Sequence, residues 1–254
     1  MTIKRTVVIP DLQVPYHDAH AVRNIAAFLK VFKHDSVVIL GDEIDLPMIS
    51  KWEENKMGWF EQTLDEHRNE AVEVIWSLTQ YAKEAHITRS NHTDRLYNVI
   101  MRKIPAFLAL PELRYDKFMR FDELGVTYEK KPYAIAKGWI AIHGDEGSIS
   151  PHAGMTALTH ARKMGFNVIC GHTHRAGQSA FTEASGGVLG RVIHGVEVGN
   201  LMNFKQAGYT KGTANWQQAF ATIETDGKRV NVQLVYIEKD GTFLVSGRRY
   251  GKPR

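Results

Sequence analysis

S36-V-V-I-L-G-D-E-I-D-L46 is the stretch of sequence that decides the fold. Its first five residues, 36–40, form an apolar run with the length and texture of a short strand buried in a sheet. Gly41 ends the run, and the carboxylates of Asp42 and Asp45 follow within a few residues. A buried strand that ends in an acidic loop predicts a sheet whose edge carries polar chemistry.

The same unit occurs twice more in the first part of the chain. Residues 4–10 (KRTVVIP) predict a strand followed by Asp11, and residues 86–89 predict a third strand followed by the polar cluster 90–94. Helical spacing of apolar residues over 19–32 and 60–85 predicts the connecting helices. Units of this kind pair parallel strands, so the loops that follow the strands are expected at one edge of the sheet.

The second half of the chain is predicted to add another sheet. Residues 138–142 and 167–170 form short apolar runs that lead into His143 and into His172 and His174, with a helix expected between them at 154–164. Further strands are predicted at 177–182, 187–198, 219–225, 229–237 and 242–245. The sequence therefore predicts an α/β fold, a four-layer α/β/β/α sandwich of two mixed sheets flanked by helices, within a single domain over 1–254.

Composition narrows the class of protein. The 254 residues contain no run near the ~20 apolar residues of a membrane-spanning helix, and a polar start argues against a signal peptide, so we expect a cytoplasmic protein without a membrane partner. The lone Cys170 excludes an internal disulfide and makes cysteine catalysis improbable. A net charge of +4 favours anionic partners, although a basic solvated surface is the plainer interpretation.

Five polar segments at predicted strand ends carry side chains that bind metals. They contain Asp11 with Gln13, Asp42 with Asp45, Asn91 with His92, His143, and His172 with His174. Each segment has an ordinary explanation by itself, but concave sites form where strand ends gather, and five such segments together indicate a metal centre. Carboxylate, imidazole and amide ligands without thiolate favour Mn²⁺, Fe²⁺, Ni²⁺ or Zn²⁺, and Asp42 is the best candidate to bridge two ions.

The order of these motifs resembles the calcineurin-like metallophosphoesterases. The matching blocks are D11-L-Q13, G41-D-E-I-D45, S90-N-H-T-D94, H143-G-D145 and G171-H-T-H174. That superfamily includes purple acid phosphatases, phage protein phosphatases and nucleases that process DNA ends. The texture of the chain is also similar to stand-alone phosphoesterases of bacteriophages, so a phage-encoded protein in the host cytoplasm is among our expectations.

The resemblance implies a role for each residue of the matching blocks. One divalent ion, most readily Mn²⁺ with Fe, Ni, Zn and Mg as alternatives, would be held by Asp11, Asp42 and His174. The other would be held by Asp42, Asn91, His143 and His172. His92 would be the general acid or a positive charge beside the phosphoryl oxygens, and Asp45 and Asp94 would be carboxylates that orient neighbouring side chains.

Two positions depart from the family pattern. Gln13 stands where the family usually has a ligating histidine, and its amide oxygen is a weaker ligand that favours Mn²⁺ or Mg²⁺. His17 in the same loop is an alternative fourth ligand, although a surface role suits it better. Ser90 replaces the usual glycine before Asn91, for which a mild effect is expected.

The function implied is hydrolysis of phosphodiester bonds of nucleic acid or nucleotides by a metal-bound hydroxide at a binuclear site. A phosphomonoesterase acting on phosphoproteins or small-molecule phosphates is the alternative, and a non-catalytic metal-dependent scaffold is a third, favoured by Gln13 but not by His92. The segment 200–218 is long for a connection, and Lys205, Tyr209, Lys211 and Trp216 are predicted to line the substrate approach. The sequence leaves the oligomeric state open.

Overall fold

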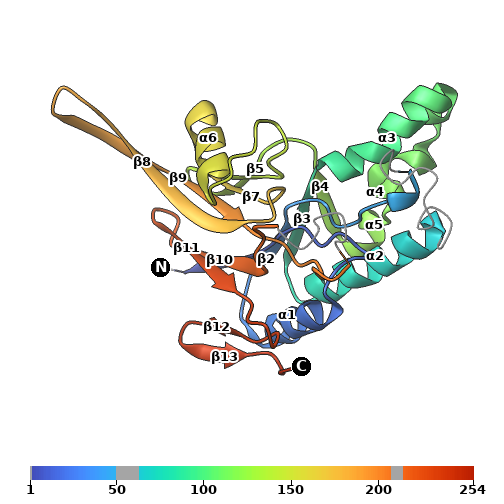
Figure 1. Cartoon of the computed structure of the whole chain (residues 1–254), viewed down its shortest axis with the longest axis horizontal. Coiled ribbons are helices and arrows are strands. Elements are labelled where there is room, and N and C mark those ends of the chain that lie inside the picture. The colour runs from blue at the N-terminus through green and yellow to red at the C-terminus, as the bar shows by residue number, and fades with distance from the viewer. Residues whose placement is uncertain (1, 50–62, 207–213) are drawn as a thin grey trace.

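The computed structural model describes residues 2–49, 63–206 and 214–254 (Figure 1). Two sheets lie face to face. The first has six strands in the order β11-β10-β1-β2-β3-β4, in which β1 to β4 run parallel and β10 and β11 are antiparallel additions. Its strands are β1 (Lys4–Ile9), β2 (Ser36–Ile39), β3 (Glu84–Thr88), β4 (Val126–Glu129), β10 (Ala219–Thr225) and β11 (Val230–Tyr236).

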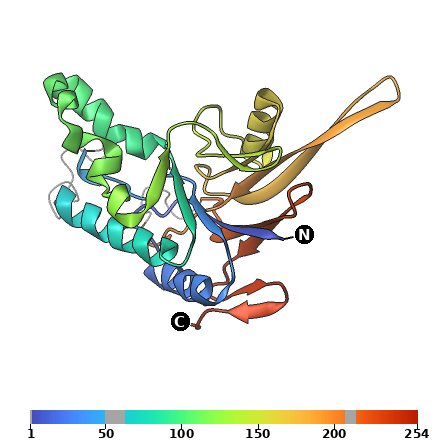
Figure 2. The same cartoon turned by 180° about the vertical axis from the view of Figure 1, so that it is seen from behind.

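The second sheet has five strands in the order β5-β6-β7-β9-β8. These are β5 (Tyr133–Ala136), β6 (Trp139–Ile142), β7 (Asn167–Cys170), β8 (Ala176–Ser185) and β9 (Val188–Val198). β6, β7 and β9 are parallel, whereas β5 and β8 are antiparallel to their neighbours. β8 and β9 form a long hairpin that projects beyond the rest of the sheet, as the view from behind also shows (Figure 2).

Helices cover the outer faces of both sheets. The α-helices are α1 (Ala19–Val31), α2 (Leu64–Thr79), α3 (Asn91–Lys103), α4 (Tyr115–Phe118), α5 (Phe121–Leu124) and α6 (Met155–Met164). Short 3-10 helices lie at η1 (Pro47–Ile49), η3 (Pro105–Ala109) and η4 (Pro111–Leu113), and a small hairpin joins β12 (Phe243–Val245) to β13 (Arg248–Tyr250). Within the described ranges, no helix is both long and apolar enough to span a bilayer.

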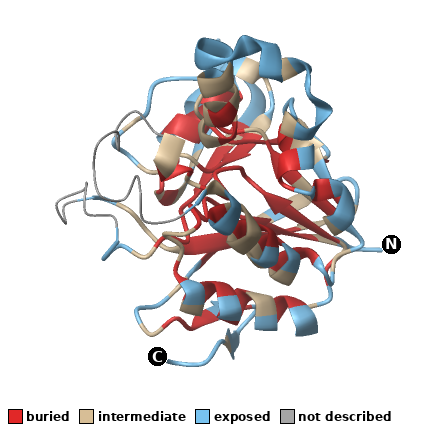
Figure 3. Cartoon of the chain, turned by 90° about the vertical axis from the view of Figure 1, so that its right-hand side faces the viewer, coloured by how far each residue is buried: buried red, intermediate tan, exposed pale blue. Residues whose placement is uncertain are grey.

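The alternation of apolar side chains along β1 and β2 explains the layers. Val7 and Val37 face α1 and α2 in one core cluster, whereas Val8 and Val38 face the second sheet in another. A third cluster lies between the second sheet and α6. Because successive side chains of a strand point to opposite faces, an apolar run such as 36–40 is buried on both sides. Figure 3 shows the resulting concentration of buried residues in the sheets.

The predicted fold class is confirmed: the structure is an α/β/β/α sandwich of two mixed sheets. Every strand predicted after residue 175 is present, within a few residues of its predicted bounds. The helix predicted over 60–85 is corrected to α2, since residues 84–85 already belong to β3 and residues 60–62 lie outside the described part of the chain. β4, β5, β13 and α3 are not predicted by the sequence pattern.

Candidate metal centre

The candidate ligands meet where the two sheets adjoin. Asp11 and Asp42 follow β1 and β2 of the first sheet, and Asn91 lies in the first turn of α3, just beyond β3. His143 follows β6 of the second sheet, and the loop with His172 and His174 follows β7. Asp11, Asp42, His143 and His174 are all buried, so the side chains converge in a site with little access to water.

The backbone at this site adopts strained conformations. Seven non-glycine residues of the described chain have a positive φ, and four of them are candidate ligands, namely Gln13, Asp42, His172 and His174. Positive φ is unfavourable for residues with a Cβ and persists only where the surrounding structure enforces it. Such concentration of backbone strain is typical of functional sites.

Two glycines allow the loops to approach one another. A Cβ on Gly171 would lie 2.1 Å from Oδ1 of Asp11, and a Cβ on Gly41, whose φ is +82°, would lie 2.6 Å from Cβ of Ser90. Neither position therefore admits a larger residue without movement of the site. This explains physically why glycine precedes both the Asp42 and the His172 loops.

The first group of ligand atoms comes from Asp11, Asp42 and His174. Their ligand atoms all lie within 4.8 Å of one another, and Nε2 of His174 is 3.0 Å from Oδ2 of Asp11. The backbone N–H of His172 donates to both carboxylate oxygens of Asp11, at 3.0 and 3.1 Å. Asp11 thus ties the first sheet to the β7 loop of the second.

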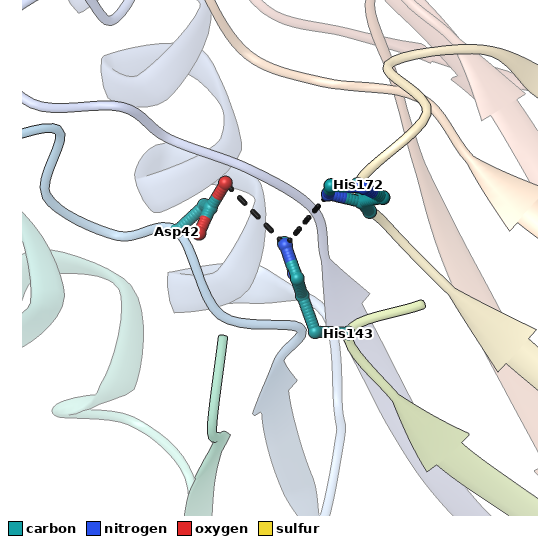
Figure 4. Close-up of side chains that lie close together, drawn as sticks. All are labelled: Asp42, His143 and His172. Carbon is teal, nitrogen blue, oxygen red and sulfur yellow. Dashed lines mark hydrogen bonds and ion pairs between the residues drawn. The ribbon is translucent and has the colours of Figure 1, made fainter. Parts of the chain in front are cut away.

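The second group consists of Asp42, His143 and His172 (Figure 4). Nε2 of His143 lies 3.4 Å from Oδ2 of Asp42 and 3.1 Å from Nδ1 of His172. Oδ1 of Asn91 is 2.8 Å from the same Nε2 atom. Nδ1 of His143 donates to the carbonyl of Leu40 at 2.7 Å, which directs Nε2 toward the other ligands, as in many histidine ligands of metals.

Asp42 is common to both groups, and its charge dominates the site. Burial raises the pKa of Asp42, but the neighbouring imidazole of His143 outweighs burial and holds this pKa well below its usual range. Conversely, burial lowers the pKa of His143, but the carboxylate of Asp42 raises it to about 10. Burial lowers the pKa of His172 and so favours the neutral ring that a metal requires. The shared carboxylate and its imidazole partners could hold two adjacent divalent ions.

Gln13 and His17 differ in their relation to the centre. Gln13 is buried, and its Nε2 donates to Oδ2 of Asp42 at 2.8 Å. Nδ1 of His17 lies 3.8 Å from Oε1 of Glu70, and His17 belongs to neither ligand group found among the described residues. The structure therefore brings Gln13, not His17, to the shared carboxylate.

His92 lies at the edge of the centre on α3. Its backbone N–H donates to Oδ1 of Asp42 at 3.3 Å, and its Nε2 lies 3.7 Å from Oδ2 of Asp42. Nδ1 lies 2.9 Å from Oδ1 of Asp45, so Asp45 is the carboxylate that contacts this ring. Arg95, which the sequence analysis does not select, places Nη2 2.9 Å from Nε2 of His92. The spacing of three residues on one helix is the signal that could have identified it.

Asp94 pairs with Arg89. Oδ2 of Asp94 accepts from Nε of Arg89 at 2.9 Å, and Nη1 of Arg89 donates to both carboxylate oxygens of Asp145, at 2.6 and 2.7 Å. Burial lowers the pKa of Arg89, but these two carboxylates outweigh it and raise the pKa further above its already high range. Arg89 therefore joins the loop after β6 to the start of α3.

Ser90 and Glu197 make hydrogen bonds that support the loops carrying the candidate ligands. The hydroxyl oxygen of Ser90 caps α3 by accepting from the N–H of Thr93, and it also accepts from the N–H of Asp42 at 3.0 Å. Serine in place of the usual glycine at position 90 therefore adds a hydroxyl that accepts two hydrogen bonds. Glu197 is completely buried; it accepts from the hydroxyl of Thr173 at 2.7 Å and from the N–H of Thr156 at 2.8 Å. Glu197 lies within β9, and nothing in the sequence pattern of this strand indicates that its carboxylate supports the ligand loops.

Tyr209 and Lys211, which were predicted to line the substrate approach, lie outside the described residues. Lys205 and Trp216 are described, and the ring of Trp216 stands edge-on to His174 with centroids 4.4 Å apart. The predicted approach thus has one side chain in direct contact with a candidate ligand.

The chain is similar to proteins of two mycobacteriophages. It is 34% identical to the Gene 54 protein of Mycobacterium phage D29 over 250 residues, which cover 96% of this chain and 97% of that protein. It is equally identical to the Gene 54 protein of Mycobacterium phage L5 over 253 residues, covering 96% and 98% of the two chains. No model of a known protein family matches the chain.

A solved structure shares the fold. Vacuolar Protein Sorting 29 from Cryptosporidium parvum superposes with a TM-score of 0.51 at 15% identity, covering 99% of this chain and 100% of that chain. At this identity the likeness concerns the sandwich and its topology. The chain belongs to the family of the mycobacteriophage Gene 54 proteins, and its sandwich has the fold of Vacuolar Protein Sorting 29.

Proposed function

We propose that the protein is a metal-dependent phosphoesterase that cleaves phosphodiester bonds of nucleic acid or nucleotides. The observation that carries this proposal is the pair of ligand groups that share Asp42. Two ions bridged by one carboxylate are the usual arrangement for hydrolysis of phosphate esters. Asp11, Asp42 and His174 would hold one ion, and Asp42, Asn91, His143 and His172 the other, with Gln13 as a further oxygen ligand after rotation of its amide.

Two divalent ions bound there would supply Lewis acidity to the phosphoryl oxygens and to the attacking water. The absence of thiolate and the presence of Asn91 and Gln13 support Mn²⁺ as the ion. The contact between Nδ1 of His143 and the carbonyl of Leu40 supports a ligand role for Nε2.

The chain itself would provide the proton for the leaving group. Nε2 of His92 first takes a proton from solvent. Water then attacks phosphorus and gives up a proton to solvent, the bond to the leaving oxygen breaks, and that oxygen takes the proton from Nε2. Asp45 holds the opposite ring nitrogen, Nδ1, and keeps the imidazole oriented. Since Nε2 now accepts from Arg95, the guanidinium must turn toward the phosphoryl oxygens when the ester binds, where its charge stabilises the transition state.

A diester substrate is favoured over a monoester by the cations and aromatic rings beside the centre. Lys205 and Trp216 line a hollow, and the ring of Trp216 contacts His174, which suits a substrate that continues beyond the scissile phosphate. A monoester would use only the metal centre.

The test compares hydrolysis of bis-p-nitrophenyl phosphate and p-nitrophenyl phosphate with Mn²⁺. We expect faster turnover of the diester, and we expect Asp42→Asn to abolish turnover together with binding of both ions. Asp122→Asn, a matched change at an exposed ion pair with Lys117, should leave both intact. A marked preference for the monoester would refute the diester assignment, and retention of two ions by Asp42→Asn would refute the shared ligand.

A further inference from the structure

A hollow of about 430 Å³ lies next to the metal centre on the side of His174. Its walls come from the segment after Asn200, from the end of β11 and from the C-terminal residues. The lining residues are Asp18, Asn203, Phe204, Lys205, Trp216, Gln217, Gln218, Tyr236, Ile237, Lys239 and Arg254. Segments that are distant in sequence therefore build one concave surface.

The lining of the hollow contacts the candidate ligand His174. The ring of Trp216 stands edge-on to the ring of His174, with centroids 4.4 Å apart and an interplanar angle of 73°. The N–H of Gln217 donates to the carbonyl of His174 at 3.1 Å. Two residues that line the hollow, Trp216 and Gln217, are thus in direct contact with a candidate ligand.

The floor of the hollow is fixed by hydrogen bonds. Nε2 of Gln218 donates to Oδ2 of Asp18 at 2.9 Å and to the carbonyl of Met202 at 2.7 Å. Asp18 also caps α1 and is paired with Arg254, so the one carboxylate in the lining is already neutralised. These contacts keep the hollow in shape without any bound molecule.

The remaining charge of the hollow is positive. Lys205 and Lys239 are exposed and approach it from different segments. Two lysines from different segments suit an anion that extends along the hollow, such as successive phosphates of a nucleic-acid strand.

Three aromatic rings line the same hollow. Phe204 and Tyr236 are 44% and 48% exposed, and the ring of Trp216 is tilted at 59° to that of Phe204 with centroids 6.2 Å apart. The hydroxyl of Tyr236 donates to the carbonyl of Ala176 at 3.1 Å, which fixes this ring. Aromatic faces beside lysines are the usual platform for unpaired bases, because every base can stack and every phosphate attracts a cation.

We infer that this hollow binds an unpaired nucleotide of a single-stranded nucleic acid and leads the adjoining phosphate to the metal centre. The direction in which the strand leads toward the metal centre rests on the proposed function. The inference that a strand binds at all depends only on the residues that line the hollow. A paired base has no free face to stack, so duplex ends are expected to bind more weakly than a single strand.

The test measures binding of a labelled oligothymidine by fluorescence anisotropy, with EDTA present so that nothing is cleaved. The double variant Lys205→Ala/Lys239→Ala should bind roughly tenfold or more weakly at low salt. Its salt dependence should be shallower by about 1.4, since each phosphate contact on a single strand contributes about 0.7 to the slope. Phe204→Ala should bind roughly tenfold more weakly with the salt slope unchanged, because it removes stacking alone.

The control is Lys228→Ala/Arg229→Ala, which also removes two positive charges, from exposed residues in the turn of the β10–β11 hairpin, and should bind like the wild type. If Lys205→Ala/Lys239→Ala also binds like the wild type, or if blunt duplex binds as tightly as the single strand, the inference is wrong.

Turnover of bis-p-nitrophenyl phosphate separates this inference from the proposed function. The small diester carries no strand, so its turnover by the wild-type protein tests the metal centre, whereas oligothymidine binding in EDTA tests the hollow. If the wild-type protein hydrolyses the small diester but Lys205→Ala/Lys239→Ala binds the strand as tightly as wild type, only the inference about the hollow is wrong. If Lys205→Ala/Lys239→Ala weakens strand binding but the wild-type protein hydrolyses no ester with any divalent ion, only the proposed function is wrong.

Discussion

Nη2 of Arg95 lies 2.9 Å from Nε2 of His92, one helical turn earlier on α3. A guanidinium can only donate, so in this arrangement Nε2 is an acceptor and the ring proton is on Nδ1, beside Asp45. The proposed proton donor is therefore held by a group that must move for the donor to act.

Arg95→Ala should lower kcat for diester hydrolysis by roughly 10²-fold, because it removes a positive charge from the transition state. The content of bound metal should not change, since Arg95 contacts no candidate ligand in the structure. Steady-state kinetics with metal analysis of the same samples measures both. Arg102→Ala on the exposed end of α3 is the matched control, and a kcat equal to wild type in Arg95→Ala would exclude a role in turnover.

His92→Ala should slow esters with alkyl leaving groups by roughly 10²–10⁴-fold while metal binding survives. The loss should be much smaller for p-nitrophenyl esters, because p-nitrophenolate leaves without a proton. Rates for a series of diesters, plotted against the pKa of the leaving alcohol, give the comparison. Equal losses across the series would mean that His92 is not the general acid.

Gln13→His should tighten binding of the ion beside Asp11 and His174 by roughly tenfold and shift its preference from Mn²⁺ toward Zn²⁺, because imidazole is a better ligand than an amide oxygen. Competition with a chromophoric chelator measures each affinity. Gln13→Ala serves as the comparison, since it removes the donor to Asp42 without adding a ligand. Identical affinities in all three proteins would place residue 13 outside the coordination sphere.

Glu197→Ala should destabilise the fold by about 3 kcal/mol, because it leaves the buried N–H groups of Thr156 and Ala157 and the hydroxyl of Thr173 without an acceptor. Thr173→Val removes only one of these bonds and should cost about 1 kcal/mol. Urea unfolding monitored by circular dichroism gives both values. Equal losses would indicate that Glu197 acts through Thr173 alone.

Asp18 should make stability depend on pH in the acid range. Burial raises the pKa of Asp18, but hydrogen bonds from Gln218 and the N–H of Ala21 and the charge of Arg254 outweigh it and lower the pKa below its ordinary value. Its stabilising effect is therefore present above the unfolded-state value of about 3.9 and is lost as the pH falls through the lower folded-state pKa.

Asp18→Ala should accordingly reduce the free energy of unfolding by about 1–2 kcal/mol at neutral pH, by loss of the cap of α1 and the contact with Arg254. The difference from wild type should shrink below about pH 4. Urea titrations across this range provide the measurement, and a constant difference at every pH would contradict the assignment.

Much of this architecture follows from local sequence signals. The apolar run 36–40 predicts a strand buried on two faces, and the structure gives those faces to α1 and α2 on one side and to the second sheet on the other. The loops at 11–13, 41–45 and 171–174 are recognisable because carboxylates and histidines follow strands directly. These sequence patterns involve residues that are close together in the chain, so they can be recognised without the structure.

Features set by tertiary packing were not predictable in this way. α3 begins with the polar residues 91–95, so its start has the composition of a loop after a strand, and its apolar side chains come only from Leu96 onward. The contact between Asp45 and His92 joins the loop after β2 to α3, and the pairing of Asp94 with Arg89 depends on where β3 ends. Contacts of this kind depend on three-dimensional neighbours that spacing alone does not give.

The hydrogen bonds from the N–H of His172 to Asp11 and from His143 to the carbonyl of Leu40 each cross from one sheet to the other. Residues that would bind metal thus also form hydrogen bonds that connect the two sheets. Ions that bind the folded centre but not the unfolded chain must favour closed sheets by mass action. Metal supply would then govern how long the folded protein survives proteolysis.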